Sequence, residues 1–499
     1  MDLSKEINPW SDKNSRNLHS ISAVIIVILL YIFFLNYFID LKTPLTIALV
    51  LLTLTPAVIM VLRFKTFTLY ILSFLVPVSI TYSIGKTNVS APSELICTLL
   101  SIFFVIKMLT GYKLPKAFLK HPISIFIMMD IAWMFVTSCT SESPAVSFKR
   151  LIIRVIYYIA FYYFYFELFK INKKNIAGIF LLHCLGFLIP IINTTIFHIG
   201  LSFNSGSAQL ASAPFYNDHT MYGAALVFFI PFLFLNTFNK SKSIKSKFLY
   251  GFLLLIFSFA AFFSYSRAAW LSLIIASVFG LILRYRISYK YILALVLTVG
   301  LIAINNFQKI NSTLTTTKEV SRSDDAGTHF KSISNVNSDA SNKERINRWK
   351  CAIRMFEAKP VFGFGPGTYQ FYYGAFQIKK DMTVISTYNG SKGHAHSEYL
   401  NALSETGLMG FLIFTGLVLT ACIRSVRLIK RGDKDTSQTA LFIFLGLITF
   451  FIHAFFNGFI EFDKLAMPVF MSYSAIMFLD IKKKDESRTL IKDANQAAV

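Results

Sequence analysis

Long apolar runs, separated by short polar segments, recur along the whole chain. Each is about 17 to 23 residues long, and a helix of that length crosses the roughly 30 Å hydrocarbon core of a bilayer. We expect fourteen such spans, with the amino terminus inside. They cover residues 20–39, 44–62, 67–84, 92–110, 122–139, 151–169, 175–197, 219–236, 248–264, 268–283, 289–305, 408–425, 438–458 and 464–480. The pattern predicts an all-α, polytopic membrane protein.

Composition and charge agree with this topology. Of 499 residues, 55% are hydrophobic and only 15% charged, which is unusual for a soluble domain. The formal net charge of +23 could indicate nucleic-acid binding, but Lys and Arg gather in alternate loops, as the positive-inside rule requires. We therefore interpret the charge as a topology signal, with the lipid bilayer and no nucleic acid as the partner. The first run lacks a convincing cleavage site and is expected to be a retained helix.

One predicted outward loop, residues 306–397, is much longer than the others. Its first part, 311–343, is rich in Ser, Thr, Asn and Asp and is expected to be a polar linker. The rest contains short helices but too few residues for an independent core, so it forms a cap on the membrane helices. We divide the chain into N-terminal membrane helices (1–199), a catalytic region that contains the loop (200–480) and a cytoplasmic tail (481–499).

An amphipathic helix is predicted in this loop at residues 343–356, ending before Pro360. Its predicted apolar stripe consists of Ile346, Trp349, Ile353 and Phe356. A glycine-rich segment follows at Gly363–Gly367. It is not a dinucleotide fingerprint, because no strand–helix unit surrounds it, and we interpret it as a turn beside a ligand. An aromatic patch at residues 371–373 comes next.

Arginines at the outward membrane boundary are candidate ligands of a phosphate group, because a guanidinium presents paired donors to phosphate oxygens. Arg267 lies in a tight link between two spans, where an interfacial snorkelling role is the alternative. Arg345 and Arg348 are neighbours on the amphipathic helix, where they could also be plain surface residues. Arg150 and Arg154 lie four residues apart at the start of a span, where lipid headgroups could neutralise them.

Two histidines, His394 and His396, precede a predicted span. On a helix, His396 would share one face with Tyr399, Leu400, Leu403 and Gly407. A neutral imidazole can accept a proton from a sugar hydroxyl, so His396 is the candidate general base, with a structural histidine as the alternative. Two imidazoles without a third ligand do not make a metal site, and we expect neither a metal nor a cofactor.

Further polar residues are predicted to face outward. Asp218 and His219 precede a span and could order sugar hydroxyls, although Asp218 could equally cap the helix. The five cysteines show no zinc spacing. Cys139 and Cys351 both face outward in this topology, so a disulfide between them stays open.

Four segments resemble the bacterial O-antigen ligase and polymerase superfamily of membrane glycosyltransferases, roughly over residues 205–470. Ser266-Arg267-Ala268-Ala269-Trp270 is similar to the family's Ser-Arg-Gly-Ala-Trp link. The other three are Arg345 four residues before Trp349, the turn Gly363–Gly367, and His396-Ser397-Glu398-Tyr399-Leu400 with Glu405 and Gly407. The last is similar to a His-Asn-x-x-Leu, Glu-x-Gly signature, with Ser at position 397 where Asn is common.

The resemblance implies transfer of a glycan from undecaprenyl pyrophosphate at the extracytoplasmic face of the bacterial cytoplasmic membrane, without a metal ion or nucleotide sugar. Arg267 and Arg345 would bind the pyrophosphate, and His396 would activate the acceptor hydroxyl. Glu398 and Glu405, in the same signature, are secondary candidates. The acceptor would be a lipid A core or similar glycolipid in a ligase, and a growing polysaccharide in a polymerase. A transporter is a third possible function. The polar groups that bind a transported substrate should lie near the membrane midplane, whereas the candidate residues here are predicted to face outward.

Overall fold

The structure is a computed structural model that describes residues 58, 63–84, 87–204, 208–286, 340–383, 386 and 393–497. The spans predicted at 20–39 and 289–305, most of the span at 44–62 and most of the linker at 311–343 lie outside these residues.

Nine helices in the described part of the chain are long and apolar enough to cross a membrane. They are α6 (Pro122–Cys139), the continuous unit of α7 (Pro144–Tyr157), η2 (Tyr158–Tyr163) and α8 (Phe164–Ile171), α9 (Asn175–Gly200), α11 (His219–Thr237), α12 (Ile244–Phe263), α13 (Arg267–Arg284), α19 (Glu398–Arg431), α20 (Lys434–His453) and α21 (Asp463–Ala497). Each overlaps one predicted span. The chain is therefore a largely helical, multi-pass membrane protein.

Polar residues at the helix ends explain where several of these helices begin. Pro122 and Pro144 occupy the first turn of α6 and α7, where the missing amide costs no hydrogen bond. Asp218 and Ser266 accept hydrogen bonds from backbone amides at the start of α11 and α13, which satisfies donors that a helix leaves unpaired. The ends of the spans are thus encoded locally, next to the apolar runs.

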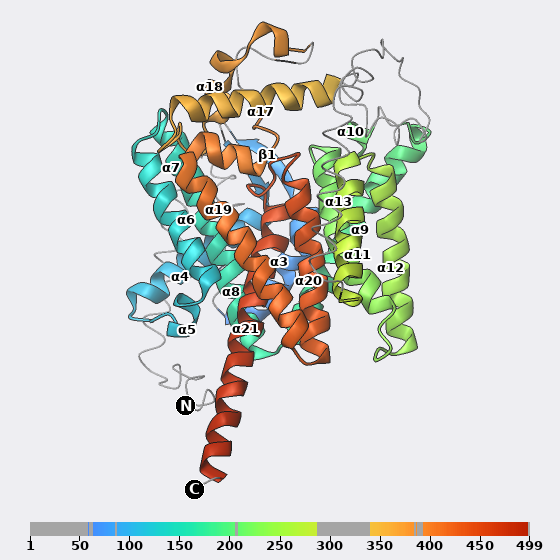
Figure 1. Ribbon diagram of the computed structural model, residues 1–499. Coiled ribbons are helices and arrows are strands. Elements are labelled where there is room, and N and C mark those ends of the chain that lie inside the picture. The colour runs from blue at the N-terminus through green and yellow to red at the C-terminus, as the bar shows by residue number, and fades with distance from the viewer. Residues whose placement is uncertain are drawn as a thin grey trace, which may run out of the picture.

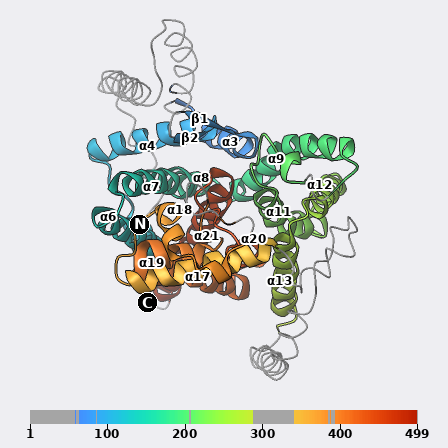
Figure 2. The ribbon, with the colours of Figure 1, turned by 90° about the horizontal axis from the view of Figure 1, so that it is seen from above.

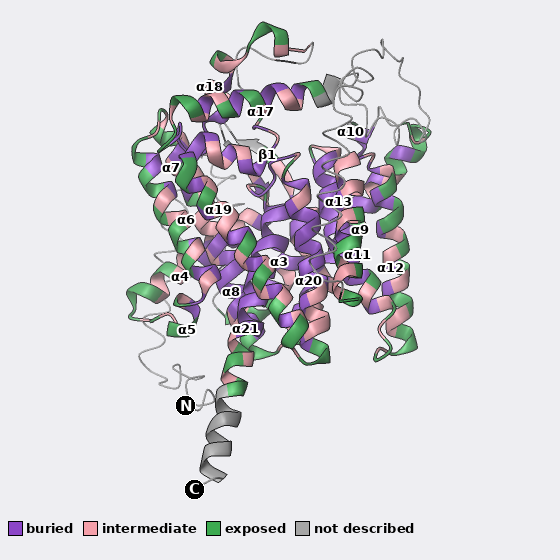
Figure 3. Ribbon diagram, viewed as in Figure 1, coloured by how far each residue is buried: buried purple, intermediate pink, exposed green. Residues whose placement is uncertain are grey.

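The helices form one bundle with α21 at its centre (Figures 1 and 2). α21 is the most deeply buried of the nine, and the buried residues concentrate in the middle of the bundle (Figure 3). α11 packs against α12 and α20, and α19 packs against α6 and α20. At the end of the bundle that is lower in Figure 1, α21 runs on as one helix to Ala497, so it includes most of the predicted tail at 481–499.

A β-hairpin interrupts the helical pattern and corrects the all-α prediction. The span predicted at 67–84 is instead α3 (Lys65–Leu75), a turn of 3-10 helix η1 (Val76–Val78) and strand β1 (Ile80–Ile84). β1 pairs antiparallel with β2 (Thr87–Ala91), with Ile80 opposite Ala91, before α4 (Ser93–Leu109). Pro77 lies in the 3-10 turn, and the alternation of Ile and Tyr with Thr and Ser after it favours a strand.

A cap lies across the upper end of the bundle in Figure 1. It consists of α17 (Ala340–Ala358), α18 (Tyr369–Tyr372), and the 3-10 turns η4 (Tyr373–Phe376) and η5 (Lys379–Asp381), together with residues 393–397 before α19. Seen from above, α17 crosses over α19 (Figure 2), against which it packs.

The cap helix was predicted correctly, but its buried face was not. Ile353, a member of the predicted apolar stripe, is 43% exposed. The face that is buried carries Glu344, Asn347, Arg348, Cys351, Ala352 and Met355. It packs on a small core made by the segment that follows the helix, including Phe364, Tyr369 and Tyr373. The predicted apolar stripe was wrong because the segment after α17 presents polar groups to the helix. Charged and amide side chains of α17 are therefore buried against that segment.

Candidate active site

His396 lies in a sharp turn between the cap and α19. Its φ of +51° is in the left-handed region, which residues other than glycine rarely adopt and which is concentrated at functional sites. Helix α19 begins only at Glu398, and the Ser397 hydroxyl accepts a hydrogen bond from the amide of Leu400 at 3.4 Å. The prediction that His396 shares a helix face was therefore wrong, because Ser397 caps the helix after it. Serine and asparagine are equally good caps, which explains the departure from the family's asparagine.

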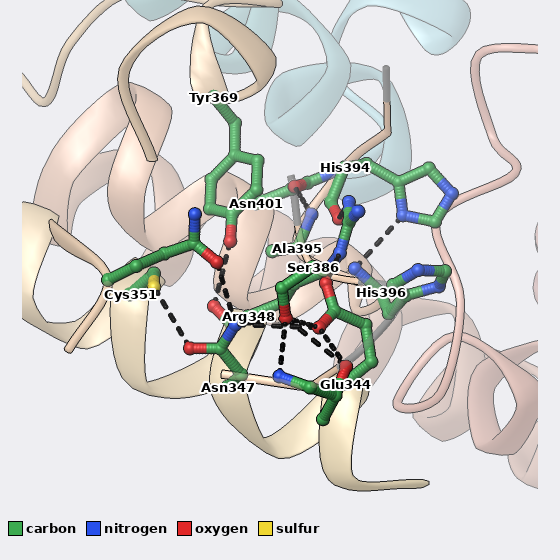
Figure 4. Close-up of polar contacts among 12 residues, drawn as sticks. Glu344, Asn347, Arg348, Cys351, Tyr369, Ser386, His394, Ala395, His396 and Asn401 are labelled. Atoms are coloured by element: carbon green, nitrogen blue, oxygen red, sulfur yellow. Dashed lines mark hydrogen bonds and ion pairs between the residues drawn. The ribbon is translucent and has the colours of Figure 1, made fainter. Parts of the chain in front are cut away.

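Helix α17 holds this turn in place through two side chains (Figure 4). Arg348 Nη1 donates to the carbonyl oxygen of His394 at 3.2 Å, and Trp349 Nε1 donates to the carbonyl oxygen of His396, also at 3.2 Å. From the other side, Asn401 of α19 accepts a hydrogen bond of 2.9 Å from the amide of Ala395. The turn is thus fixed at both carbonyls and at the amide between them.

His394 holds the backbone of its neighbour His396. Its Nδ1 accepts a hydrogen bond of 3.0 Å from the backbone amide of His396, and the two ring centroids lie 4.7 Å apart (Figure 4). Burial, His396 and Arg348 hold the pKa of His394 well below its usual value, so the ring is neutral. Nδ1 is therefore occupied as an acceptor. Among the described residues, no group of three or more His, Cys, Asp or Glu side chains is arranged to hold a metal ion.

The His396 ring is neutral and keeps one nitrogen without a partner among the described residues. Burial first, and then the positive charges of Arg348 and Arg345, lower its pKa to about 3, because a cation in a desolvated site next to other cations is unfavourable. Its Nδ1 is buried and has no hydrogen-bond partner within the described part of the chain. A neutral imidazole with an unused nitrogen can accept a proton from a hydroxyl group.

Arg345 lies within electrostatic range of three histidines. It interacts electrostatically with His396, with His219 at the start of α11 and with His453 at the end of α20. Arg267, at the start of α13, interacts with the same His219. The two predicted phosphate ligands, which are far apart in sequence, are therefore both within electrostatic range of His219.

The close packing of α11 and α13 explains how Arg267 reaches His219. Gly223 lies one turn after His219, and a Cβ placed there would lie 2.8 Å from both Ser264 and Ser266 in the link before α13. The absence of a side chain lets the link approach α11. Asp218, the other candidate before this span, caps α11 by accepting a hydrogen bond of 2.7 Å from the amide of Thr220.

Arg348 has a different role from Arg345, although both are on α17. Its Nε donates to Glu344 at 2.9 Å, and its guanidinium carbon lies 5.0 Å from the centre of the Tyr373 ring. With the bond to His394, these contacts occupy the guanidinium within the protein (Figure 4). Of the two neighbouring arginines, Arg348 is therefore the positioning residue.

Glu398 and Glu405 also hold backbone segments. The carboxylate of Glu405 accepts hydrogen bonds of 2.8 and 3.0 Å from the amides of Gly367 and Tyr369, so it fixes the glycine-rich turn. Glu398 accepts a bond of 2.6 Å from the amide of Ile460 in the link between α20 and α21. Both residues bind the protein's own backbone, which explains their buried positions.

Arg150 and Arg154 lie on α7 and are paired with acidic side chains. Arg150 forms an ion pair with Glu461, and Arg154 lies 3.9 Å from Asp130. Arg150 also interacts electrostatically with His394, so it lies near the histidine turn. Neutralisation here comes from protein carboxylates, where the sequence had suggested lipid headgroups.

Two residues near His396 were not predicted: His453, the last residue of α20, and Asn457, in the link after it. Asn457 is buried, hydrogen-bonds the His396 ring and lies 3.5 Å from Nδ1 of His453. The only signal was a histidine and an asparagine four residues apart at the end of the span predicted at 438–458, where their apolar neighbours obscured it. The cysteines are all free, with Cys351 buried and Cys139 exposed, so the disulfide between them does not form.

The comparisons with known proteins agree with this geometry. Residues 250–415 match the family model described as O-antigen ligase. The exopolysaccharide production protein ExoQ of Rhizobium meliloti is 26% identical over 152 residues, 30% of this chain and 33% of that protein. An uncharacterized protein of Haemophilus influenzae is 25% identical over 219 residues, 43% of this chain and 52% of that protein.

These alignments cover about half or less of the relatives' own length. The family match nevertheless includes the helices and the cap that bring Arg267, Arg345 and His396 together. It therefore confirms the resemblance of this part of the chain to the O-antigen ligase and polymerase superfamily.

Proposed function

We propose that this protein is an O-antigen ligase-like glycosyltransferase that moves a glycan from undecaprenyl pyrophosphate to an acceptor hydroxyl, such as one on a lipid A core. The observation that carries the proposal is the neutral ring of His396 within electrostatic range of Arg345. A base beside a fixed cation is what transfer from a pyrophosphate donor requires, because a hydroxyl must lose its proton while an anionic leaving group departs.

In the proposed reaction, Nδ1 of His396 takes the proton from the acceptor hydroxyl. The oxygen attacks the anomeric carbon, and the bond from that carbon to the pyrophosphate oxygen breaks with its electron pair on the pyrophosphate. Arg267 and Arg345 bind the pyrophosphate and stabilise the charge that develops on it. A single displacement of this kind inverts the anomeric configuration.

The proposed setting is the bacterial cytoplasmic membrane, with the cap as a large extracytoplasmic loop. The lipid-linked donor then reaches the site from the outer leaflet. Two fixed guanidinium groups supply the positive charge that other enzymes take from a metal ion, so we propose that transfer needs neither a metal nor a cofactor.

A polymerase that joins repeat units on the same lipid carrier is the second candidate. It is favoured by the similarity to ExoQ, whose name refers to exopolysaccharide production. The two activities use the same donor chemistry and differ in the acceptor. A deletion strain separates them on a gel, because loss of a ligase leaves long polysaccharide on undecaprenyl pyrophosphate, whereas loss of a polymerase leaves a single repeat unit.

The direct test uses the purified full-length protein with a defined lipid-linked donor and candidate acceptors. We expect His396→Ala to reduce transfer by roughly 10²- to 10⁴-fold, and Arg267→Ala to reduce it strongly, while both variants are produced normally. Arg427→Ala removes an exposed arginine from the far end of α19 and serves as the control. Transfer at the wild-type rate by His396→Ala would overturn the assignment of the base.

A further inference from the structure

A second imidazole, that of His453, lies at the same site and is not used in the proposed reaction. It terminates α20 and is 2% exposed. It interacts electrostatically with Arg345 from the cap and with Asp218 from α11. Its ring therefore lies within electrostatic range of Arg345, which is proposed to bind the donor, and of Asp218, which caps α11.

Nε2 of His453 has no hydrogen-bond partner in the parts of the chain that the structure describes. Leaving a buried polar atom without a partner is unfavourable. Several described side chains share this feature, His183 among them, and what distinguishes His453 is its electrostatic interaction with Arg345. A second observation concerns the neighbouring amide. Asn457 is buried between the rings of His453 and His396 and contacts both.

The Asn457 amide assigns opposite roles to the two rings. Its Nδ2 faces Nδ1 of His453 at 3.5 Å, and an amide nitrogen can only donate. In the tautomer that fits this contact, Nδ1 of His453 accepts the hydrogen bond and Nε2 carries the proton. The amide oxygen remains for His396, and because Nδ1 of that ring has no partner among the described residues, the contact is with Nε2–H. His396 then keeps a lone pair on Nδ1, whereas His453 presents an N–H.

A buried N–H next to a guanidinium selects an anionic oxygen. A metal ion would be repelled by Arg345 and would find a proton in place of a lone pair on Nε2. A phosphate oxygen accepts from both groups at once. We propose that His453 Nε2–H is a third ligand of the donor's pyrophosphate, beside Arg345, and that Asn457 positions it; this inference rests on the proposed function.

The test compares two polar replacements of His453 in the full-length protein in lipid nanodiscs. Glutamine places its amide nitrogen where Nε2 of histidine lies, whereas the shorter asparagine reaches only the position of Nδ1. We expect His453→Gln to bind undecaprenyl pyrophosphate as the wild type does, and His453→Asn to bind it roughly tenfold more weakly, the loss of one hydrogen bond. His183→Asn, at a buried histidine of α9 stacked on Phe229, is the control and should bind normally.

The outcomes separate this inference from the proposed function. Equal binding by the wild type and both His453 variants overturns the role of His453 and leaves the glycosyltransferase proposal intact. A raised KM for the acceptor with unchanged undecaprenyl pyrophosphate binding places His453 on the acceptor, which also overturns it. If the wild-type protein does not bind undecaprenyl pyrophosphate, the proposed donor is wrong. The proposed function and the role of His453 then fail together.

Discussion

The indole Nε1 of Trp349 donates a hydrogen bond of 3.2 Å to the main-chain carbonyl oxygen of His396. The bond joins the cap helix α17 to a residue whose backbone is in the left-handed region. A residue in such a conformation persists only when its surroundings hold it there. Trp349 is therefore one of the groups that set the direction of the His396 ring.

Replacing this indole should slow transfer without weakening donor binding. Trp349→Phe keeps an aromatic ring but removes the donor, and we expect kcat to fall several-fold, because one hydrogen bond contributes about 1 kcal/mol. Steady-state kinetics with the lipid-linked donor measure the change. The matched control is Trp133→Phe, which removes an indole bond of 2.8 Å to Thr406, away from the histidine turn, and should leave kcat unchanged. An unaltered kcat in Trp349→Phe would contradict the positioning role.

The pH dependence of transfer should reflect the unusual ionisation of His396. Burial, Arg348 and Arg345 lower its pKa to about 3, so the ring is neutral, and able to act as a base, at every pH well above that value. We expect kcat/KM, which reports ionisations of the free protein, to show no loss from His396 between about pH 5 and 8. A wild-type profile that falls by half near pH 6.5 would contradict this.

Removing the positive charge of Arg345 should raise the pH at which activity is lost as the solution is acidified. Arg345→Gln takes away a group that disfavours the imidazolium form, so the pKa of His396 rises and activity is lost at a higher pH as the solution is acidified. Because burial is the larger cause, the pKa should stay below its usual value. Arg354→Gln is the control, since that guanidinium lies on the same helix but pairs with Asp381 at 2.8 Å, and its profile should match the wild type.

The helix cap at Ser397 should be replaceable by the asparagine that is common in the family. Ser397→Asn keeps a side-chain acceptor for the amide of Leu400, so thermal stability and transfer should both be retained. Ser397→Ala removes it and should cost about 1 kcal/mol, seen as a lower Tm in detergent. Ser487→Ala alters an exposed serine in the extended part of α21 and should not change Tm. Equal Tm values for Ser397→Ala and wild type would show that the cap contributes nothing.

The sequence predicted the membrane helices well because each apolar run carries its own signal. It also predicted that Arg267, Arg345 and His396 would lie on one side of the bundle, since the positive-inside pattern orders the loops. The hairpin at 80–91 was missed because Ile80 and Ile84 continue an apolar run, and hydropathy alone does not distinguish a buried strand from a helix.

Other errors arose where a partner distant in sequence decides the structure. The face of α17 that is buried is chosen by the segment around Tyr369, whose hydroxyl donates to the carbonyl of Arg348 at 2.8 Å. Periodicity within the helix contains no information about that partner. The convergence of Asn457 on His396 is similar, because it depends on how the link after α20 folds back on the start of α19.

Helix α19 is broken at Gly407, whose φ of +68° and ψ of −169° are not helical. A side chain there would collide with the backbone of Val361, so glycine is required for the approach of the cap. In a continuous helix, each inserted or deleted residue rotates everything beyond it by about 100°. The break isolates the histidine turn from such changes, so the membrane-spanning part of α19 can vary in length, tilt and lipid-facing sequence while the orientation of His396 is preserved.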